Sequence, residues 1–261
     1  MTAPTFGRLE ALLVAIPANT YGFKVDAGAN AYVPAGDYYL SSTAPTGSAS
    51  LIAAVQTLLA AAVAASTAAI SPTTGAITFT FGSGTHTLTW ASTNLRDLLG
   101  FTGTLTPAAA AFTATKLPTC AWMPNAYQSE HRGSANALGG RADDTVTARS
   151  QSGAPWKTTY NTYRDQRFAF VGLTKAKVWT EDEAAPLNGA WETFWANHLS
   201  AAGSGRFRHY TNNADATSYT ASVSGLARDY VFDRWEDPTR LKPNVDALWA
   251  VRFNAKYLVT P

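Results

Sequence analysis

The chain has very little cysteine and no sequence signature of secretion. Cys120 is its single cysteine among 261 residues, which excludes an internal disulfide. No Asn-x-Ser/Thr glycosylation site occurs. An apolar run at residues 12–16 follows Arg8, but it is short and Glu10 interrupts its basic flank, so no signal peptide is expected. These absences give no support to an oxidising or glycosylated extracellular setting.

Charged residues are also scarce, above all in the first 117 residues. Asp, Glu, Lys and Arg make up 15% of the chain, against about 25% in an average globular protein. Of the 38 charged residues, 30 follow residue 117, and the 8 before it are Arg8, Glu10, Lys24, Asp26, Asp37, Arg96, Asp97 and Lys116. The net charge of +2, with no long basic run, indicates neither a nucleic-acid partner nor an anionic membrane surface.

Apolar and aromatic residues are plentiful enough to fill a large core. They reach 46% and 12% of the chain, which excludes a disordered protein. Tryptophan divides as charge does, because Trp90 is the only one of eight before residue 117. The composition therefore predicts three parts: a charge-poor, Ala/Thr-rich region at 1–117, an extended loop or arm at 118–155, and a Trp-rich β domain with one amphipathic helix at 156–261.

One apolar stretch has the length of a membrane span. Residues 51–70 contain nine alanines, are interrupted by Gln56, Thr57, Ser66 and Thr67, and have no Lys or Arg close by. A span is expected to be more apolar and to carry basic flanks that set its orientation. The stretch is interpreted as a buried or self-associating helix, and no membrane span is expected.

The first region is expected to contain a helix, a hairpin and a second, shorter helix. Ser48 or Ser50 can cap the first helix, whose apolar residues recur at helical spacing. Alternating apolar residues at 77–81 and 86–90 flank a Gly-Ser-Gly turn, which predicts a β-hairpin. Residues 95–99 predict the short helix, ended by Gly100, and 112–116 predict another strand.

The second region begins with a stretch poor in periodic pattern and continues with strands. Residues 124–155 are rich in Gly, Ser, Ala and Asn and predict an arm or extended loop. Strands are expected from residue 156 to 178 with a bend at Gly172, and at 206–210, 219–223, 230–235 and 248–259. Residues 187–199 predict an amphipathic helix. The fold class is therefore α+β, predominantly antiparallel β with a few helices.

No catalytic or cofactor-binding motif stands out. His86, His131, His198 and His209 never form a close metal-binding pair, and no glycine-rich phosphate loop occurs. Acidic clusters at 143–144, 181–183 and 236–237 are adjacent in sequence, whereas a glycosidase needs two carboxylates that face each other across a bond. A dispersed Ser-His-Asp triad stays open as an alternative, but no nucleophile elbow marks one. We expect no enzyme activity, no cofactor and no metal.

A set of aromatic and basic residues at 206–210, with Arg228, Tyr230 and Arg234, has two interpretations. It can form a stacking platform for single-stranded nucleic acid or sugar. It can equally be a strand with Phe207 in the core and Arg206 and Arg208 in solvent. We prefer the second interpretation.

The scarcity of charge in the first region predicts an assembly surface. Charge is depleted at the centres of protein interfaces because burying an unpaired ion is costly, whereas methyl and hydroxyl groups are buried at little cost once hydrogen bonded. A Ser/Thr-rich monomeric β domain is the competing interpretation. The candidate interface residues are Leu51, Val55, Leu58, Leu59, Val63, Leu95, Leu98, Leu99, Phe101, Arg132 and Arg141.

Two segments resemble virion proteins of tailed bacteriophages. The run Ile77-Thr78-Phe79-Thr80-Phe81 to Trp90, followed by Leu95-Arg96-Asp97-Leu98-Leu99-Gly100-Phe101, is similar to a pattern found in them. The segment from Trp191-Glu192-Thr193-Phe194-Trp195 to Phe207-Arg208-His209-Tyr210, with the last strand, resembles β-rich tail and tail-tip proteins. The resemblance covers about a third of the chain and carries no catalytic residue across.

The resemblance implies a structural component of a phage virion, assembled in the host cytoplasm. A ring-forming tail, tail-tip or baseplate protein is the specific expectation, with homo-oligomeric contacts and other virion proteins as partners. A carbohydrate-binding or receptor-binding virion protein is the alternative, with a host-surface glycan as its partner. A cell-wall hydrolase is the third hypothesis.

Overall fold

A computed structural model gives the fold of the chain. It describes residues 8–41, 49–71, 74–124, 127–128, 141–149, 155–179, 189–200, 203–210, 227–241 and 248–258. Within the described residues, no helix has both the length and the apolar character needed to cross a bilayer.

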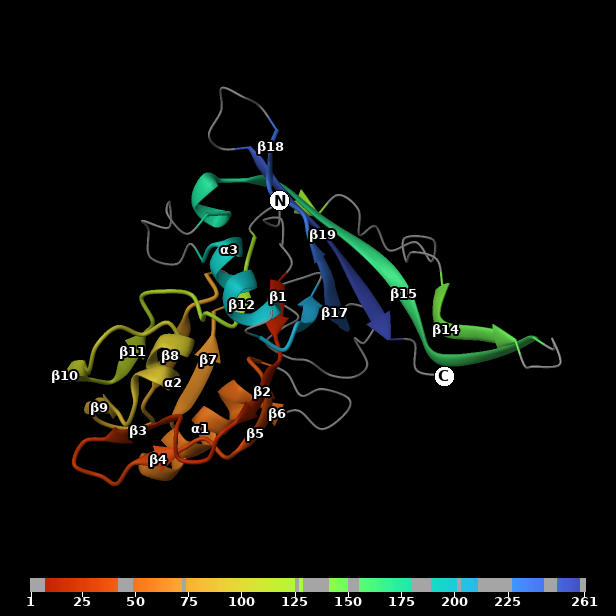
Figure 1. Ribbon diagram of the computed structural model, residues 1–261. Coiled ribbons are helices and arrows are strands. Elements are labelled where there is room, and N and C mark those ends of the chain that lie inside the picture. Colours follow the sequence, from red (N-terminus) through yellow and green to blue (C-terminus); the bar gives the residue numbers. More distant parts are fainter. Residues whose placement is uncertain are drawn as a thin grey trace.

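The described residues are mostly antiparallel β with three α-helices, which confirms the predicted fold class. Figure 1 shows two lobes. One lobe is built on a nine-stranded sheet, and we call it the large-sheet lobe. The other contains three small sheets and the first two helices, and we call it the small lobe.

The large sheet has the order β12-β1-β16-β17-β19-β15-β13, with β14 paired to β15 and β18 paired to β19. Its strands are β1 (Arg8–Ala11), β12 (Ala121–Trp122), β13 (Tyr127–Gln128), β14 (Arg141–Arg149), β15 (Pro155–Leu173), β16 (Arg206–Tyr210), β17 (Ala227–Trp235), β18 (Thr239–Arg240) and β19 (Trp249–Leu258). The lobe also contains a 3-10 turn (Lys175–Lys177), α3 (Trp191–Phe194) and a π-helical turn (Trp195–Leu199).

The small lobe contains sheets β10-β9-β3-β4, β11-β8-β7 and β2-β5-β6. Its elements are β2 (Leu13–Ile16), β3 (Gly22–Val25), β4 (Ala31–Tyr32), β5 (Gly36–Tyr39), β6 (Ala49–Ser50), α1 (Leu51–Ala62), β7 (Thr67–Ile70), β8 (Ile77–Thr80), β9 (His86–Trp90), α2 (Thr93–Leu98), β10 (Leu105–Ala109) and β11 (Ala111–Thr113). Every strand pair is antiparallel except β5 with β6.

The first helix forms where the leucine and valine spacing predicts it. Ser50 caps α1, because its hydroxyl accepts a 3.2 Å hydrogen bond from the Ala53 amide. Leu51, Val55 and Leu59 are fully buried along one side of the helix. The helix ends at Ala62, and part of the remaining apolar stretch forms β7 instead.

The predicted hairpin between residues 77–81 and 86–90 is wrong. Both strands exist as β8 and β9, but β8 pairs with β7 and β11, whereas β9 pairs with β3 and β10. Gly82 lies where the chain passes between the sheets, and a Cβ at this position would lie 2.1 Å from the Ala64 carbonyl oxygen. Phe79 packs against Phe23 and Phe101, at centroid distances of 6.4 and 4.8 Å. Core packing between the layers therefore replaces pairing across the turn.

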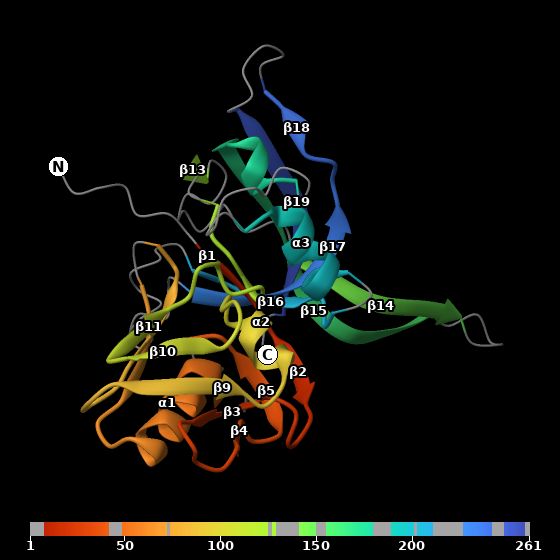
Figure 2. The same ribbon diagram turned by 90° about the vertical axis from the view of Figure 1, so that its left-hand side faces the viewer.

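The strand β1 does not belong to the lobe in which its position in the chain would place it. It lies between β12 and β16 in the large sheet, and Leu9 and Ala11 belong to the core of that lobe. The predicted first region, 1–117, thus contributes an interior strand to the large sheet. Figure 2 shows β1 beside β16, with the small lobe below them.

Aromatic side chains fill the core of the large-sheet lobe. Trp191 of α3 stacks on Phe253 of β19 with ring centroids 4.9 Å apart, and Phe168 of β15 stacks on the same ring at 4.9 Å. In β19, Val251, Phe253 and Ala255 are fully buried and alternate with partly exposed neighbours. This confirms the predicted alternation of the last strand in its described part.

Two predictions for the large-sheet lobe are corrected in extent. The helix expected at 187–199 begins at Trp191 and changes to a π-helical turn at Trp195, while Leu187 lies outside the described residues. Arg208 was expected to face solvent, yet it is 1% exposed, because the small lobe covers that side of β16. The expected bend at Gly172 is confirmed, since its φ of 83° coincides with a register shift in β15.

Part of the expected loop or arm at 118–155 is regular structure. β14 pairs with β15 from Arg141 opposite Arg164 to Arg149 opposite Pro155. Residues 155–162 of β15 pair with β14 alone among the described strands, whereas 163–173 pair with β19. Figure 1 shows that β14 and the part of β15 paired with it extend beyond the rest of the large sheet.

Candidate functional site: an uncharged sheet face

Most of the candidate interface residues lie inside the small lobe. Seven of them are buried in its own core: Leu51, Val55, Leu59, Leu95, Leu98, Leu99 and Phe101. They cannot contact another molecule in this conformation, so this part of the prediction is corrected. Leu58 and Val63 are partly buried against the same core. Arg141 begins β14, and Arg132 lies outside the described residues.

An exposed face of the small lobe fits the expected assembly surface better. In the sheet β11-β8-β7, Thr80 pairs with Ala111 and Thr67, and Thr78 pairs with Thr113 and Ala69. Five of these six side chains are exposed and Thr78 is partly exposed, while Ile77 and Phe79 point to the core. We call the six residues the threonine–alanine face: Thr67, Ala69, Thr78, Thr80, Ala111 and Thr113.

The threonine–alanine face has no charge on its surface or along its outer strands. Its hydroxyls engage one another, since the Thr78 and Thr113 oxygens lie 3.0 Å apart. Among the described strands, β7 and β11 each pair on one side only. Edge strands of monomeric proteins are commonly protected by charged residues, which discourage pairing with another chain. These two edges carry none.

The alternation of Thr78 and Thr80 with Ile77 and Phe79 was the sequence signal for this face. Selecting the most apolar residues as interface candidates missed it, because such residues fill the core of their own lobe first. The informative positions were the neutral polar ones between them.

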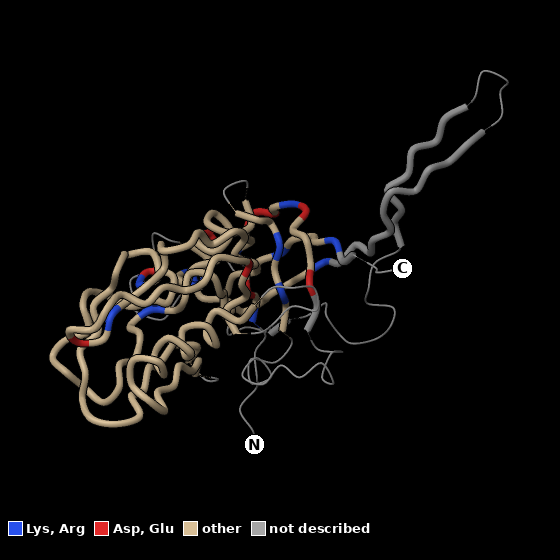
Figure 3. Tube along the Cα trace, turned by 90° about the horizontal axis from the view of Figure 1, so that it is seen from below, with Lys and Arg blue, Asp and Glu red and all other residues tan. Residues whose placement is uncertain are grey.

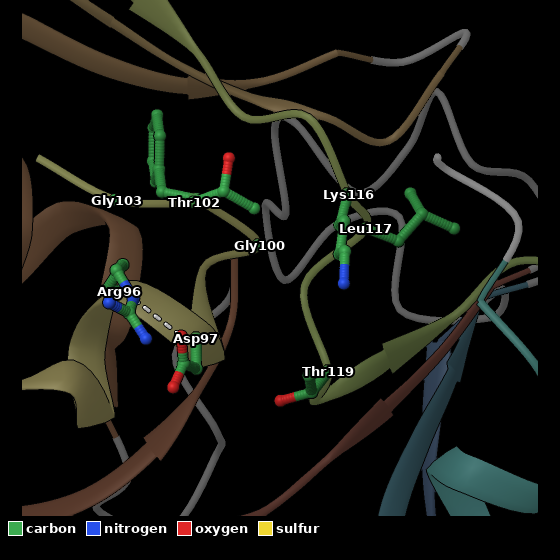
Figure 4. A pocket seen from close by; sticks show the side chains of 9 residues that line it. Arg96, Asp97, Gly100, Thr102, Gly103, Lys116, Leu117 and Thr119 are labelled. Atoms are coloured by element: carbon green, nitrogen blue, oxygen red, sulfur yellow. Dashed lines mark hydrogen bonds and ion pairs between the residues drawn. The ribbon is translucent and has the colours of Figure 1, made fainter. Parts of the chain in front are cut away.

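The charges of the small lobe gather in a few places. Figure 3 shows long tan stretches of that lobe between isolated coloured positions. Three of the charged residues, Arg96, Asp97 and Lys116, line one pocket of about 350 Å³, seen in Figure 4. The Arg96 Nε donates to Asp97 Oδ1 at 2.7 Å. The rest of the lining is Gly100, Phe101, Thr102, Gly103, Leu117 and Thr119.

A second charged pair closes the turn before β9. Nδ1 of His86 lies 2.7 Å from Asp26 Oδ2, and its Nε2 donates to the Ser83 carbonyl oxygen at 2.8 Å. The Asp26 carboxylate also accepts from the Thr87 amide at 2.8 Å. The hydrogen bonds to Asp26 and Ser83 raise the pKa of His86, and the hydrogen bond from His86 lowers the pKa of Asp26. The arrangement favours a cationic imidazole.

This pair predicts a pH-dependent contribution to stability. A raised histidine pKa stabilises the fold below its unfolded value of about 6.5, and the contribution is lost as pH rises through the folded pKa. We expect H86Q to lower Tm relative to the unmodified chain more at about pH 5.5 than at about pH 8.5. Thermal unfolding followed by circular dichroism measures both differences. An equal difference at the two pH values would contradict the assignment.

A buried polar layer lies between the two lobes. Arg8 and Glu10 of β1 are both 0% exposed and form an ion pair. The Ser41 hydroxyl donates to Glu10 Oε1 at 2.6 Å, and its oxygen accepts a hydrogen bond from Arg8 Nη2 at 2.6 Å. Because Leu9 and Ala11 point into the aromatic core, Arg8 and Glu10 point from the other face of β1 toward the small lobe.

The same layer includes a second ion pair. Arg208 Nε and Nη2 donate to the two oxygens of Asp229 at 2.6 and 2.9 Å. The Arg208 guanidinium lies 4.5 Å from the ring centroid of Tyr39 on β5, and that of Arg8 lies 5.2 Å from the ring of Tyr210. Burial raises the pKa of the Tyr39 phenol. These contacts hold the two lobes in one orientation.

Three further nucleophilic or titratable groups, Cys120, His198 and His209, occupy structural positions. Cys120 is fully buried, and burial raises its thiol pKa, which keeps it protonated and unreactive. Burial lowers the pKa of His198 to about 4. His209 packs edge-on against Phe168, with centroids 5.2 Å apart. Among the described residues, no group of three or more His, Cys, Asp or Glu side chains could hold a metal ion.

The structure describes two of the three acidic clusters, those at 143–144 and 236–237. Asp237 accepts from the Trp235 indole at 2.7 Å, and Glu236 lies 3.5 Å from Arg167, so both have structural partners. Residues 143–144 lie on β14, and 181–183 fall outside the described residues.

Two partly exposed tryptophans, Trp195 and Trp235, pack against each other. Trp195 and Trp235 have centroids 4.5 Å apart, but their rings are tilted by 48°. A flat platform for a sugar needs coplanar rings, which this pair does not provide.

Comparison with known proteins gives no relative: no family model, no curated protein and no solved structure matches the chain.

Proposed function

We propose that the protein is a structural component of a tailed-phage virion, in the tail, tail tip or baseplate, and acts by subunit packing without catalysis. The observation that carries the proposal is the threonine–alanine face with its two uncharged edges. The resemblance of two segments to virion proteins supports the choice of a virion over other assemblies.

The physical argument concerns the cost of removing surface from water. Covering methyl and hydroxyl groups desolvates no ion, and threonine hydroxyls can keep their hydrogen bonds to one another. The outer backbone groups of β11 can pair with a strand of a neighbouring chain. On β7 the Ala68 amide already donates to Gln56 Oε1 at 3.4 Å. A contact of this kind, repeated head to tail between copies, closes a ring when its rotation permits.

The large-sheet lobe then supplies the outward surface. Charged side chains such as Arg167, Asp233 and Lys256 are partly or well exposed on it, and the last two form an ion pair at 3.0 Å. The buried layer around Arg8 and Arg208 fixes this lobe relative to the packed one. Such a division suits a protein that joins copies through one lobe and presents the other to different partners.

A charge placed on the threonine–alanine face tests the proposal. Thr80 is exposed at the centre of the face, on β8, so T80K is expected to leave the fold intact and weaken self-association by about a hundredfold, because the ammonium would be buried without a partner. Thr239 is exposed on β18 of the other lobe, and T239K is the matched control. Analytical ultracentrifugation measures the association of all three proteins.

Two results would overturn the packing role. One is an unmodified chain that stays monomeric at micromolar concentration. The other is equal association of T80K and the unmodified protein. Mass spectrometry of purified virions from the source then tests the location, and absence of the polypeptide from them would contradict a virion component.

A further inference from the structure

The pocket lined by Arg96 and Lys116 is held open by the backbone. The Lys116 amide donates to the Gly100 carbonyl oxygen at 3.0 Å, and the Thr119 amide donates to Leu98 at 3.0 Å. Gly100 has a φ of 79°, and a Cβ there would lie 2.3 Å from the Lys116 carbonyl oxygen. The two walls therefore meet at a contact that only glycine permits. Their rigidity means that a ligand would not have to order them.

The charges in the pocket are only partly compensated. Arg96 forms its ion pair with Asp97 through Nε, and no other ion pair or hydrogen bond of its side chain occurs in the described part of the chain. Lys116 is exposed and its ammonium has no partner among the described residues. Figure 4 shows Arg96 and Asp97 on one side of the pocket and Lys116 and Thr119 on the other. Two cations against one carboxylate leave one net positive charge.

This concentration of charge contrasts with the rest of the lobe. Apart from Arg8 and Glu10, which belong to the large sheet, the first 117 residues contain six charged side chains, and three of them line this pocket. Half of the charged side chains of this lobe therefore gather at one pocket. The pocket is separate from the threonine–alanine face, because its residues come from α2, the loop after it and the segment before β12.

We propose that this pocket binds a carboxylate group. The Nη atoms of Arg96, the ammonium of Lys116 and the Thr119 hydroxyl supply donors from both sides. A single negative charge neutralises the net charge of the pocket. A phosphate dianion would leave it negative beside Asp97, so the carboxylate is preferred.

Binding is tested with acetate on the full-length, ¹⁵N-labelled chain, kept monomeric by dilution. Sodium acetate replaces sodium chloride at constant ionic strength, and the amide signals of Gly100, Gly103 and Thr119 are followed. We expect saturable shifts with a Kd on the order of 1–10 mM, as suits a ligand of four heavy atoms. K116Q is expected to weaken binding about fivefold or more. K24Q, which removes a lysine elsewhere in the lobe, should leave it unchanged.

Inorganic phosphate tests the charge argument. It is expected to bind the unmodified chain more weakly than acetate, and D97N is expected to improve phosphate binding because it removes the opposing carboxylate. The proposal is overturned by shifts that do not saturate, by equal losses in K116Q and K24Q, or by phosphate binding more tightly than acetate.

A second measurement identifies the source of the carboxylate and rests on the proposed function. If an Asp or Glu of a neighbouring copy fills the pocket, K116Q lowers self-association and acetate competes with it. If a free small carboxylate is the ligand, K116Q associates as the unmodified chain does. Both results keep the pocket as a carboxylate site. A failure of the T80K test leaves the acetate titration unaffected, so the two proposals fail separately.

Discussion

Replacing Glu10 by alanine is expected to lower the free energy of unfolding by about 3–5 kcal/mol, the range found when one partner of a buried ion pair is removed. Glu10 is 0% exposed and offers its two oxygens to Arg8 and to the hydroxyl and amide of Ser41. Arg8 is equally buried, and its Nε and Nη1 have no hydrogen-bond partner among the described residues. Without Glu10, its charge would be left uncompensated between the lobes.

Urea unfolding followed by circular dichroism measures the change. D97A is the control, because Asp97 forms an exposed pair with Arg96, and exposed pairs contribute about 0–1 kcal/mol. The double variant R8M/E10L removes both charges and is expected to be more stable than E10A, since no ion then remains buried alone. An E10A protein within about 1 kcal/mol of the unmodified chain would contradict this account of the layer.

Replacing Trp191 by alanine is expected to cost about 3–5 kcal/mol through loss of aromatic packing and the cavity left behind. Trp191 is 0% exposed and lies among Phe253, Trp235 and Trp122, at centroid distances of 4.9, 6.0 and 5.0 Å. It joins α3 to the sheet strands β12, β17 and β19. Its removal therefore loosens several elements at once.

Equilibrium unfolding in guanidinium chloride measures this loss. W179A is the matched control: Trp179 is only partly buried and packs edge-on against Trp249, so its truncation is expected to cost clearly less. If W179A destabilised the protein as much as W191A, the aromatic cluster around Trp191 would not be the centre of this core.

Local pattern was sufficient to predict many elements. The alternation from Trp249 to Ala255 gave both a strand and its buried face, and the spacing of Leu51, Val55 and Leu59 gave a helix with a buried side. These features depend on the period of the backbone, which is the same wherever the element finally packs.

Pairing between distant strands was not predictable in the same way. β8 and β9 have the alternation and turn of a hairpin, yet each pairs with strands from elsewhere in the chain. The burial of Arg208 has the same origin, since it depends on Tyr39 and the small lobe coming to lie against β16. In both cases the contacting residues lie far away in the sequence, so a local pattern does not predict them.

The candidate site illustrates how composition and position differ as signals. The scarcity of charge drew attention to residues 1–117, where the proposed assembly surface lies, but the choice of Leu95, Leu99 and Phe101 named residues of the interior. Threonine and alanine on the outer positions of β7, β8 and β11 form the surface that we propose instead. Neutral polar residues are common on ordinary sheets, so only their placement in one continuous face made them recognisable.

The position of β1 has a consequence for the order in which the protein matures on the ribosome. Its two neighbours in the large sheet come from residues 121–122 and 206–210, the latter roughly 200 residues further along the chain. The core of the small lobe can be completed once residue 121 has emerged. Until β16 is synthesised, one edge of β1 has no partner strand, and Arg8 and Glu10 remain in contact with water. The burial of this ion pair is therefore a late step of folding, and it joins the small lobe to the large-sheet lobe.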